Sequence, residues 1–138
     1  MKNNKKGFTL VELLAVIVIL AIIALIATPI ILNVIDDAKT NAAKNSAYGY
    51  IDALEKVNAQ DMLSSESINV LSGTYTISND GTLTHDEKAV TVKFKGTKQT
   101  GGTLTYADGK LSSGSSIIVD GKTFTSDADG KLTLSTGK

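Results

Sequence analysis

One acidic residue, Glu12, lies at the start of an apolar run in which the next charged residue is Asp36. An ionised side chain at the centre of a bilayer costs about 2.5–3.5 kcal/mol, and less near the interface. Glu12 therefore either lies in the headgroup layer or has a cation beside it. The nearest cations in the sequence are Lys5 and Lys6. The sequence therefore predicts that the negative charge of Glu12 is stabilised, either by solvation in the headgroup layer or by pairing with an ammonium group.

The remaining reactive side chains do not form a catalytic set. The 138 residues contain no Cys and one His, which excludes thiol nucleophiles, disulfides and cysteine-based zinc sites. The single His85 stands beside Asp86 and Glu87, and we expect it in an exposed polar turn with no nucleophile pattern around it. The sequence therefore predicts that the protein is not an enzyme and binds no cofactor.

Two short motifs resemble parts of ligand-binding loops. Gly121-Lys122-Thr123 resembles the end of a phosphate-binding loop, but Ser116 stands where that loop needs a Gly, and no helix is expected after it. Asp127-Ala128-Asp129-Gly130 resembles a fragment of a calcium loop without the bidentate Glu of an EF-hand. Both motifs are interpreted as β-turns, and no metal site is predicted.

The charge balance gives little support for nucleic-acid binding. The formal net charge is zero, whereas binding to a phosphate backbone needs an excess of cations. A local basic cluster contains four lysines, Lys88, Lys93, Lys95 and Lys98. Such a cluster binds anionic polymers or DNA in some proteins, but more often protects a sheet edge and aids solubility. We favour the second interpretation.

The segment Leu13–Leu32 contains no charge, and 20 helical residues span roughly 30 Å, the thickness of a bilayer core. Lysines precede the segment and Asp36 and Asp37 follow it, which predicts a cytoplasmic N-terminus. Between Ala21 and Pro29 no two small residues stand two positions apart, as a signal-peptidase site requires, so we expect a retained single-pass anchor in the cytoplasmic membrane. Pro29 cannot donate to the carbonyl of Leu25, which predicts a helix kink.

A polar but periodic stretch follows, from Asp36 to about Leu63. Five apolar residues in it are spaced by three or four positions, namely Ala43, Ala47, Tyr50, Leu54 and Val57. Nothing between Leu32 and Asp36 stops a helix, so we expect one helical rod of roughly 50 residues whose second half is amphipathic.

From Ser64 onward the pattern changes to a period of two. Strands are predicted at Val90–Phe94 and Leu104–Tyr106 and around Tyr75, Phe124 and Leu132. Asp-Gly pairs beginning at residues 80, 108, 120 and 129 predict tight turns and a meander of antiparallel strands. A small sheet without Cys is marginal alone, so the helix must complete its core. The predicted fold class is α+β: a long N-terminal α-helix packed on a small antiparallel β-sheet head.

The N-terminal residues carry a resemblance to a known family. Lys5-Lys6-Gly7-Phe8-Thr9-Leu10-Val11-Glu12-Leu13-Leu14 resembles the processing and assembly motif of type IV pilins and pseudopilins. The resemblance implies that a prepilin peptidase cuts after Gly7 and methylates Phe8, and that Glu12 neutralises the Phe8 amine of an adjacent subunit. Pro29 falls where the family commonly has a helix-perturbing Pro. The resemblance also keeps open a single-loop calcium site at residues 127–130, as an alternative to a plain turn.

The predicted organisation follows: a leader (1–7), a hydrophobic transmembrane and assembly helix (8–35), the amphipathic half of the helix (36–63) and the sheet head (64–138). The resemblance implies a type IV pilin that forms a helical homopolymer on the cell surface. Its expected partners are the prepilin peptidase, the membrane before assembly, and the assembly platform with its ATPase machinery. The alternatives are a pseudopilin of a type II secretion or DNA-uptake system, or a non-polymerising membrane-anchored binding module.

Overall fold

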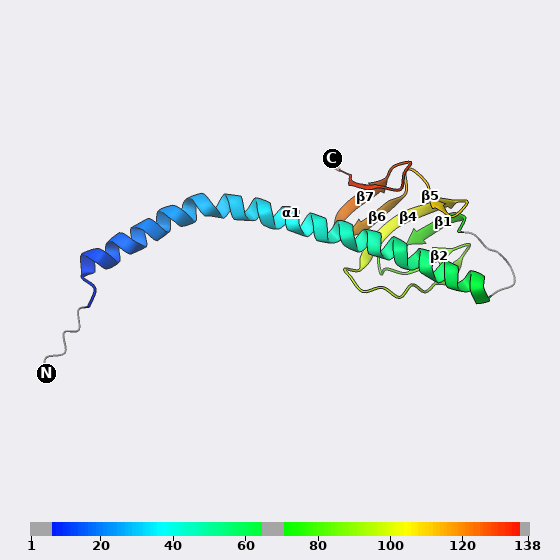
Figure 1. Cartoon of the computed structure of the whole chain (residues 1–138), viewed down its shortest axis with the longest axis horizontal. Coiled ribbons are helices and arrows are strands. Elements are labelled where there is room, and N and C mark those ends of the chain that lie inside the picture. Colours follow the sequence, from blue (N-terminus) through cyan, green and yellow to red (C-terminus); the bar gives the residue numbers. More distant parts are fainter. Residues whose placement is uncertain (1–6, 65–70, 136–138) are drawn as a thin grey trace, which may run out of the picture. The chain divides into compact units, whose positions relative to one another are not determined.

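The structure is a computed structural model that describes residues 7–64 and 71–135. Residues 1–6 of the predicted leader and residues 65–70 of the predicted head lie outside the described residues. One long helix, α1 (Leu10–Ser64), precedes eight strands (Figure 1). The helix packs against an antiparallel eight-stranded sheet, which confirms the predicted α+β class. A boundary after Ala38 divides the chain into two compact units.

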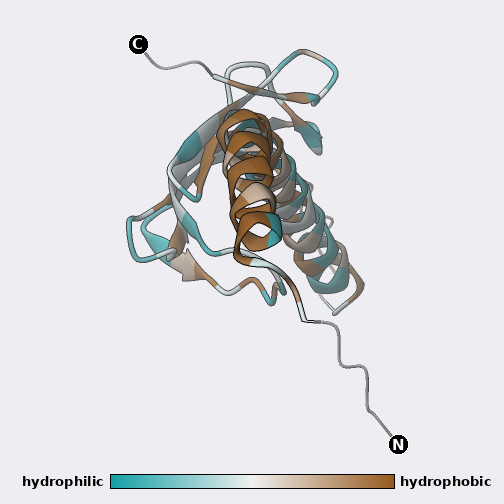
Figure 2. Cartoon of the chain, turned by 90° about the vertical axis from the view of Figure 1, so that its left-hand side faces the viewer, coloured by the Kyte–Doolittle hydropathy of each residue, from teal (hydrophilic) through white to brown (hydrophobic). Residues whose placement is uncertain are grey.

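Up to Ala38, the apolar side chains of α1 are not buried by other described residues. None of its residues in this unit is buried, and Figure 2 shows it hydrophobic on the sides turned to the viewer. By its length and composition, α1 is long and apolar enough to cross a membrane. This agrees with the predicted membrane anchor.

The helix continues through Pro29. Proline has no N–H, so the carbonyl of Leu25 loses its usual helical donor. One residue earlier, the hydroxyl of Thr28 donates to the carbonyl oxygen of Ala24. Both features are recognised causes of helix bending, and the kink at Pro29 stays a prediction.

The second unit contains α1 from Lys39 and all the strands. The strands are β1 (Gly73–Ile77), β2 (Leu83–His85), β3 (Lys88–Val90), β4 (Gln99–Ala107), β5 (Lys110–Leu111), β6 (Ser116–Val119), β7 (Lys122–Ser126) and β8 (Leu132–Leu134). Their order across the sheet is β3-β2-β1-β4-β6-β7-β8, and β5 pairs with β4. Every pairing is antiparallel.

The predicted meander is wrong at one place. After β3, the chain returns through residues 91–98 and enters β4 beside β1. The strand predicted over Val90–Phe94 ends at Val90, although burial still alternates through residues 91–95. This segment contacts the helix instead of a strand. The Phe94 ring meets Tyr50 edge-on at 5.7 Å between centroids, and the Thr97 N–H donates to Ser46 Oγ at 3.3 Å.

The Asp-Gly turns are largely as predicted. Asp108-Gly109 and Asp120-Gly121 have positive φ at both residues, the conformation of tight two-residue hairpin turns. A further turn of this kind, Asp86-Glu87, joins β2 to β3 with φ of 49° and 62°. It contains no Gly, so the sequence signal for it is weak.

The helix completes the core, as predicted. Ala43, Ala47, Tyr50 and Leu54 are buried, whereas Val57 is half-buried and Ile51 is the additional buried helix residue. They form one cluster with buried strand residues, including Leu83, Leu104, Ile117, Phe124 and Leu132. The head therefore depends on residues 43–54 of α1 for five of the fifteen buried core residues that the structure describes.

The last strand is fastened to the helix by a hydrogen bond. The N–H of Leu132, a fully buried residue of β8, donates to the Tyr48 hydroxyl at 2.7 Å. The preceding turn is held by Asp127, whose Oδ1 accepts from the N–H groups of Asp129 and Lys131, each at 2.9 Å. These contacts secure the C-terminal strand of a chain without cysteine.

Replacing Tyr48 by Phe removes the acceptor and leaves a buried N–H without a partner. We expect Tyr48→Phe to lower the free energy of unfolding by about 1–2 kcal/mol and Tm by roughly 5–10 °C. Thermal unfolding of the detergent-solubilised full chain measures this effect.

The matched control is Tyr106→Phe. The Tyr106 hydroxyl is buried and has no hydrogen-bond partner among the described residues, so its removal should leave Tm unchanged or raise it. Equal destabilisation by both variants would contradict the role assigned to Tyr48.

Candidate processing and assembly site

The first turn of α1 is closed by a reciprocal pair of hydrogen bonds. The N–H of Glu12 donates to Thr9 Oγ1 at 3.2 Å, and the N–H of Thr9 donates to Glu12 Oε2 at 3.0 Å. The N–H of Leu13 donates to the Thr9 carbonyl at 3.1 Å. This arrangement is a capping box, which satisfies backbone donors that a helix start otherwise leaves without acceptors.

The cap determines where the Glu12 charge lies. A carboxylate in the first turn is stabilised by the positive end of the helix dipole. It also has two oxygens that can accept about four hydrogen bonds, so the bond from Thr9 leaves capacity for an ammonium group. Glu12 thus has a polar partner in its own chain and can still neutralise a cation.

The predicted cleavage point lies outside the helix. Residues Gly7–Thr9 are not helical, and Phe8 is 89% exposed. A Cβ added at Gly7 would meet no other atom within 4 Å. Exposed, non-helical backbone is the kind of chain that peptidases cut, so the geometry is compatible with the predicted roles of Gly7 and Phe8.

Three of the predicted site residues are therefore close together at the start of α1: Gly7, Phe8 and Glu12. Pro29 lies several turns farther along the helix. The residue missing from the prediction is Thr9, although the spacing Thr-x-x-Glu before an apolar run is a sequence signature of a capping box.

His85, the single histidine, is held by contacts within the sheet. His85 is half-buried, not exposed as expected: its ring stacks on Tyr75 at 4.1 Å. Its Nδ1 lies 3.0 Å from the Thr74 carbonyl oxygen, and its Nε2 lies 3.4 Å from Asp86 Oδ2. The paired strand residues bring the Tyr75 ring beneath it, a long-range effect that the polar neighbours in sequence do not reveal.

The Asp127–Gly130 turn uses one acidic side chain for its own backbone, since Asp127 Oδ1 accepts two N–H groups. Within residues 7–64 and 71–135, no three His, Asp or Glu side chains form a group that could hold a metal ion. The absence of a cofactor stays a prediction.

Comparison with known proteins points to the same N-terminal segment. A family profile described as "Prokaryotic N-terminal methylation motif" matches residues 2–28. A curated relative, "Prepilin peptidase-dependent protein A" of Clostridium perfringens (strain 13 / Type A), is 36% identical over 69 residues. The aligned part is 50% of this chain and 49% of the relative, so the chain spans about half the length of the curated relative that it matches. No solved structure matches the chain.

These findings define the class of protein as a membrane-anchored precursor with a prepilin-type N-terminus. The resemblance recognised in the sequence is thereby confirmed at the N-terminal motif, and the matched relative is a protein named for its dependence on prepilin peptidase.

Thr9→Ala should loosen the first turn of α1, because the cap loses its hydroxyl acceptor. An N-cap of this type contributes about 1 kcal/mol, so amide exchange at Val11 and Glu12 should become roughly fivefold faster. Hydrogen-exchange NMR of the full chain in detergent micelles measures it. Thr9→Ser keeps the hydroxyl and serves as control, and unchanged exchange in the Ala variant would contradict the cap.

Proposed function

We propose that the chain is the structural subunit of a type IV pilus. In this proposal, a prepilin peptidase removes residues 1–7 and methylates the new N-terminal Phe8, and copies then polymerise through α1 into a surface filament. The observation that carries the proposal is a capped carboxylate, Glu12, at the start of an apolar helix that bears a prepilin motif.

The apolar half of α1 supports the polymerisation step. Its large side chains are open to the surroundings, with Leu10 at 85% and Leu25 at 79% exposure. Such a surface is stable in lipid or against other apolar helices. Lipid chains are as apolar as the helix, so transfer from membrane to filament changes the hydrophobic energy little. A directional polar contact must then favour the assembled state.

Glu12 and the Phe8 amine of a neighbouring copy can supply that contact. Cleavage after Gly7 creates an ammonium group, which keeps two N–H donors after methylation and can pair with a carboxylate in a charge-assisted hydrogen bond. The Thr9 N–H holds one oxygen of Glu12 at the helix start. The carboxylate is thus presented at the N-terminal end, where the amine of a staggered neighbour would arrive.

The proposal includes the expected partners and locations. The precursor lies in the cytoplasmic membrane with its N-terminus in the cytoplasm, and the assembly platform and ATPase machinery transfer it to the filament. The role is structural rather than enzymatic, and we assign it no cofactor. A pseudopilin would use the same N-terminal chemistry in a short envelope-spanning assembly, and a binding module would keep its leader.

The variant Glu12→Gln tests the charge of this site. Glutamine can take the same place in a capping box but cannot neutralise an ammonium group. We expect the variant to be inserted and cleaved normally, while the yield of sheared filaments falls about tenfold or more, because a hydrogen bond to a charged group contributes about 1.5–3 kcal/mol.

Thr9→Ala is the matched control, since it removes the cap hydroxyl and keeps the Glu12 charge; it should still form filaments. N-terminal sequencing of the sheared wild-type protein should begin at Phe8. Normal filaments from Glu12→Gln would contradict the charge pair. Recovery of the wild-type chain with an intact leader would contradict processing.

A further inference from the structure

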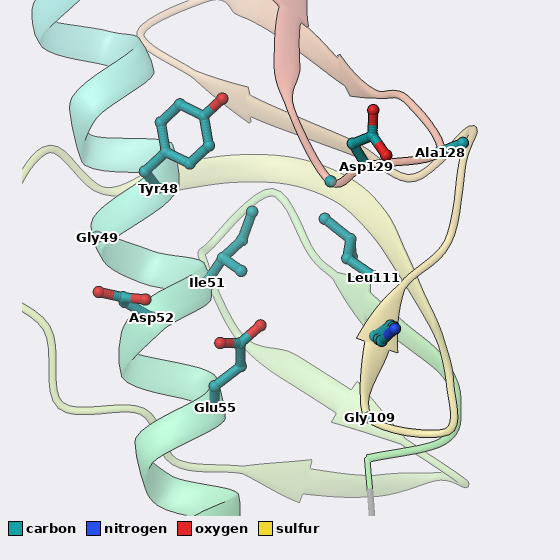
Figure 3. A pocket seen from close by; sticks show the side chains of 11 residues that line it. Tyr48, Gly49, Ile51, Asp52, Glu55, Gly109, Leu111, Ala128 and Asp129 are labelled. Carbon is teal, nitrogen blue, oxygen red and sulfur yellow. The ribbon is translucent and has the colours of Figure 1, made fainter.

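Two grooves flank one exposed strip of α1 in the second unit. The first has a volume of about 660 Å³ and lies between helix residues 48–55 and the turns at 109–111 and 128–130 (Figure 3). The second, of about 650 Å³, lies between helix residues 49–60 and the segment 91–95. Gly49 and Asp52 line both grooves, so the grooves lie on opposite flanks of the same helical segment.

The first groove is acidic. Its charged residues are Asp52, Glu55, Asp129 and one lysine, Lys110. In Figure 3, Glu55 and Ile51 project from α1 toward Leu111, and Asp129 lies across the groove. The three acids against one lysine give this acidic groove a net negative charge.

The second groove is basic. Three lysines line it, Lys56, Lys93 and Lys95, against one acid, Asp52. Its apolar lining includes the half-buried Phe94 and Val57. Of the four lysines in the sequence cluster, Lys93 and Lys95 line this basic groove, whereas Lys88 and Lys98 line other depressions.

Among the described residues, none of the groove acids or lysines forms an ion pair. Burial raises the pKa of Glu55, and the nearby Asp52 carboxylate raises it further. Burial also raises the pKa of the Tyr106 hydroxyl, with Glu55 as a second cause. The acidic groove thus holds three carboxylates against one lysine, and none of them is in an ion pair within the described residues.

We propose that the acidic groove of one subunit binds the Lys93–Lys95 segment of a second copy of the chain. The contact joins two different patches on the two flanks of one helix, so it is heterologous, and such a contact repeats from copy to copy in a filament when the rotation between copies does not close a ring. This inference rests on the proposed function, because a filament supplies the parallel neighbours that the contact needs.

Charge complementarity of this kind fixes which surfaces meet more than it adds affinity. A single exposed ion pair contributes little to affinity. In a filament, however, the same contact would be repeated between each subunit and the next copy. The half-buried Leu111 adds some apolar surface to the acidic groove.

Charge reversal in the full-length protein tests the contact. The double variant Lys93→Glu and Lys95→Glu should reduce filament yield about tenfold, because like charges then face each other. The matched control, Lys88→Glu with Lys98→Glu, changes the net charge equally within the same segment and should leave the yield unchanged. Adding Glu55→Lys and Asp129→Lys to the first double variant should restore filaments. Equal yields from the two double variants would overturn the proposal.

Cross-linking gives a second measurement that does not depend on those charge changes. The chain has no native Cys, so Asp129→Cys with Lys95→Cys introduces the sole reactive thiols. A short bismaleimide should convert filaments of this variant into a ladder of covalent oligomers, while Asp129→Cys with Lys98→Cys should give at least tenfold less. Filaments without the ladder would overturn the groove contact and leave the proposed function standing. Absence of wild-type filaments would overturn both.

Discussion

A single carboxylate at the start of an uncovered apolar helix is the constraint on which the first unit depends. The apolar side chains make the helix compatible with lipid or with its own copies, and Glu12 is the charge that distinguishes the two surroundings. The Thr9–Glu12 cap shows how the structural role of this side chain is compatible with the assembly role that we propose for it. The cap satisfies backbone N–H groups at the helix start. It also keeps the Glu12 charge at the N-terminal end of the helix, where an ammonium group can reach it.

The second unit depends on the same helix for a different reason. The core-facing side of the sheet is covered by the helix, which adds five buried residues to the cluster: Ala43, Ala47, Tyr50, Ile51 and Leu54. The bond from Leu132 to Tyr48 then ties the last strand to the helix. One continuous helix therefore carries two sequence requirements: unbroken hydrophobicity up to residue 35 and an amphipathic pattern after it.

Much of this could be predicted from sequence because the signals are local. Charge-free length predicts the apolar helix, three-and-four spacing predicts its buried face, and Asp-Gly pairs predict hairpin turns. The missed features depend on contacts between distant residues. The edge-on contact of Phe94 with Tyr50 draws residues 91–95 away from the sheet, and Tyr75 stacks on His85. Gly102 has φ of 130°, and a side chain there would collide with the backbone of Ser116 in the neighbouring strand. No pattern around these residues encodes such partners. Within the candidate site, the capping role of Thr9 could have been predicted from the Thr-x-x-Glu signature. No sequence motif marks the two grooves.

The formal charge of zero conceals a separation of charge between two grooves that bears on the assembly we propose. Apolar helices pack in lipid-like surroundings with little preference for one register, because their side chains gain similar contacts in many positions. Polar groups restrict the choice, since a misplaced charge loses its partner and keeps its desolvation cost. The chain places such groups at two levels, Glu12 at the helix start and the oppositely charged grooves beside residues 48–60. In the proposed filament, a charge pair at Glu12 and a groove contact in the second unit would together restrict both the axial position and the rotation of a subunit relative to its neighbour, which a single charge pair at the N-terminus cannot do.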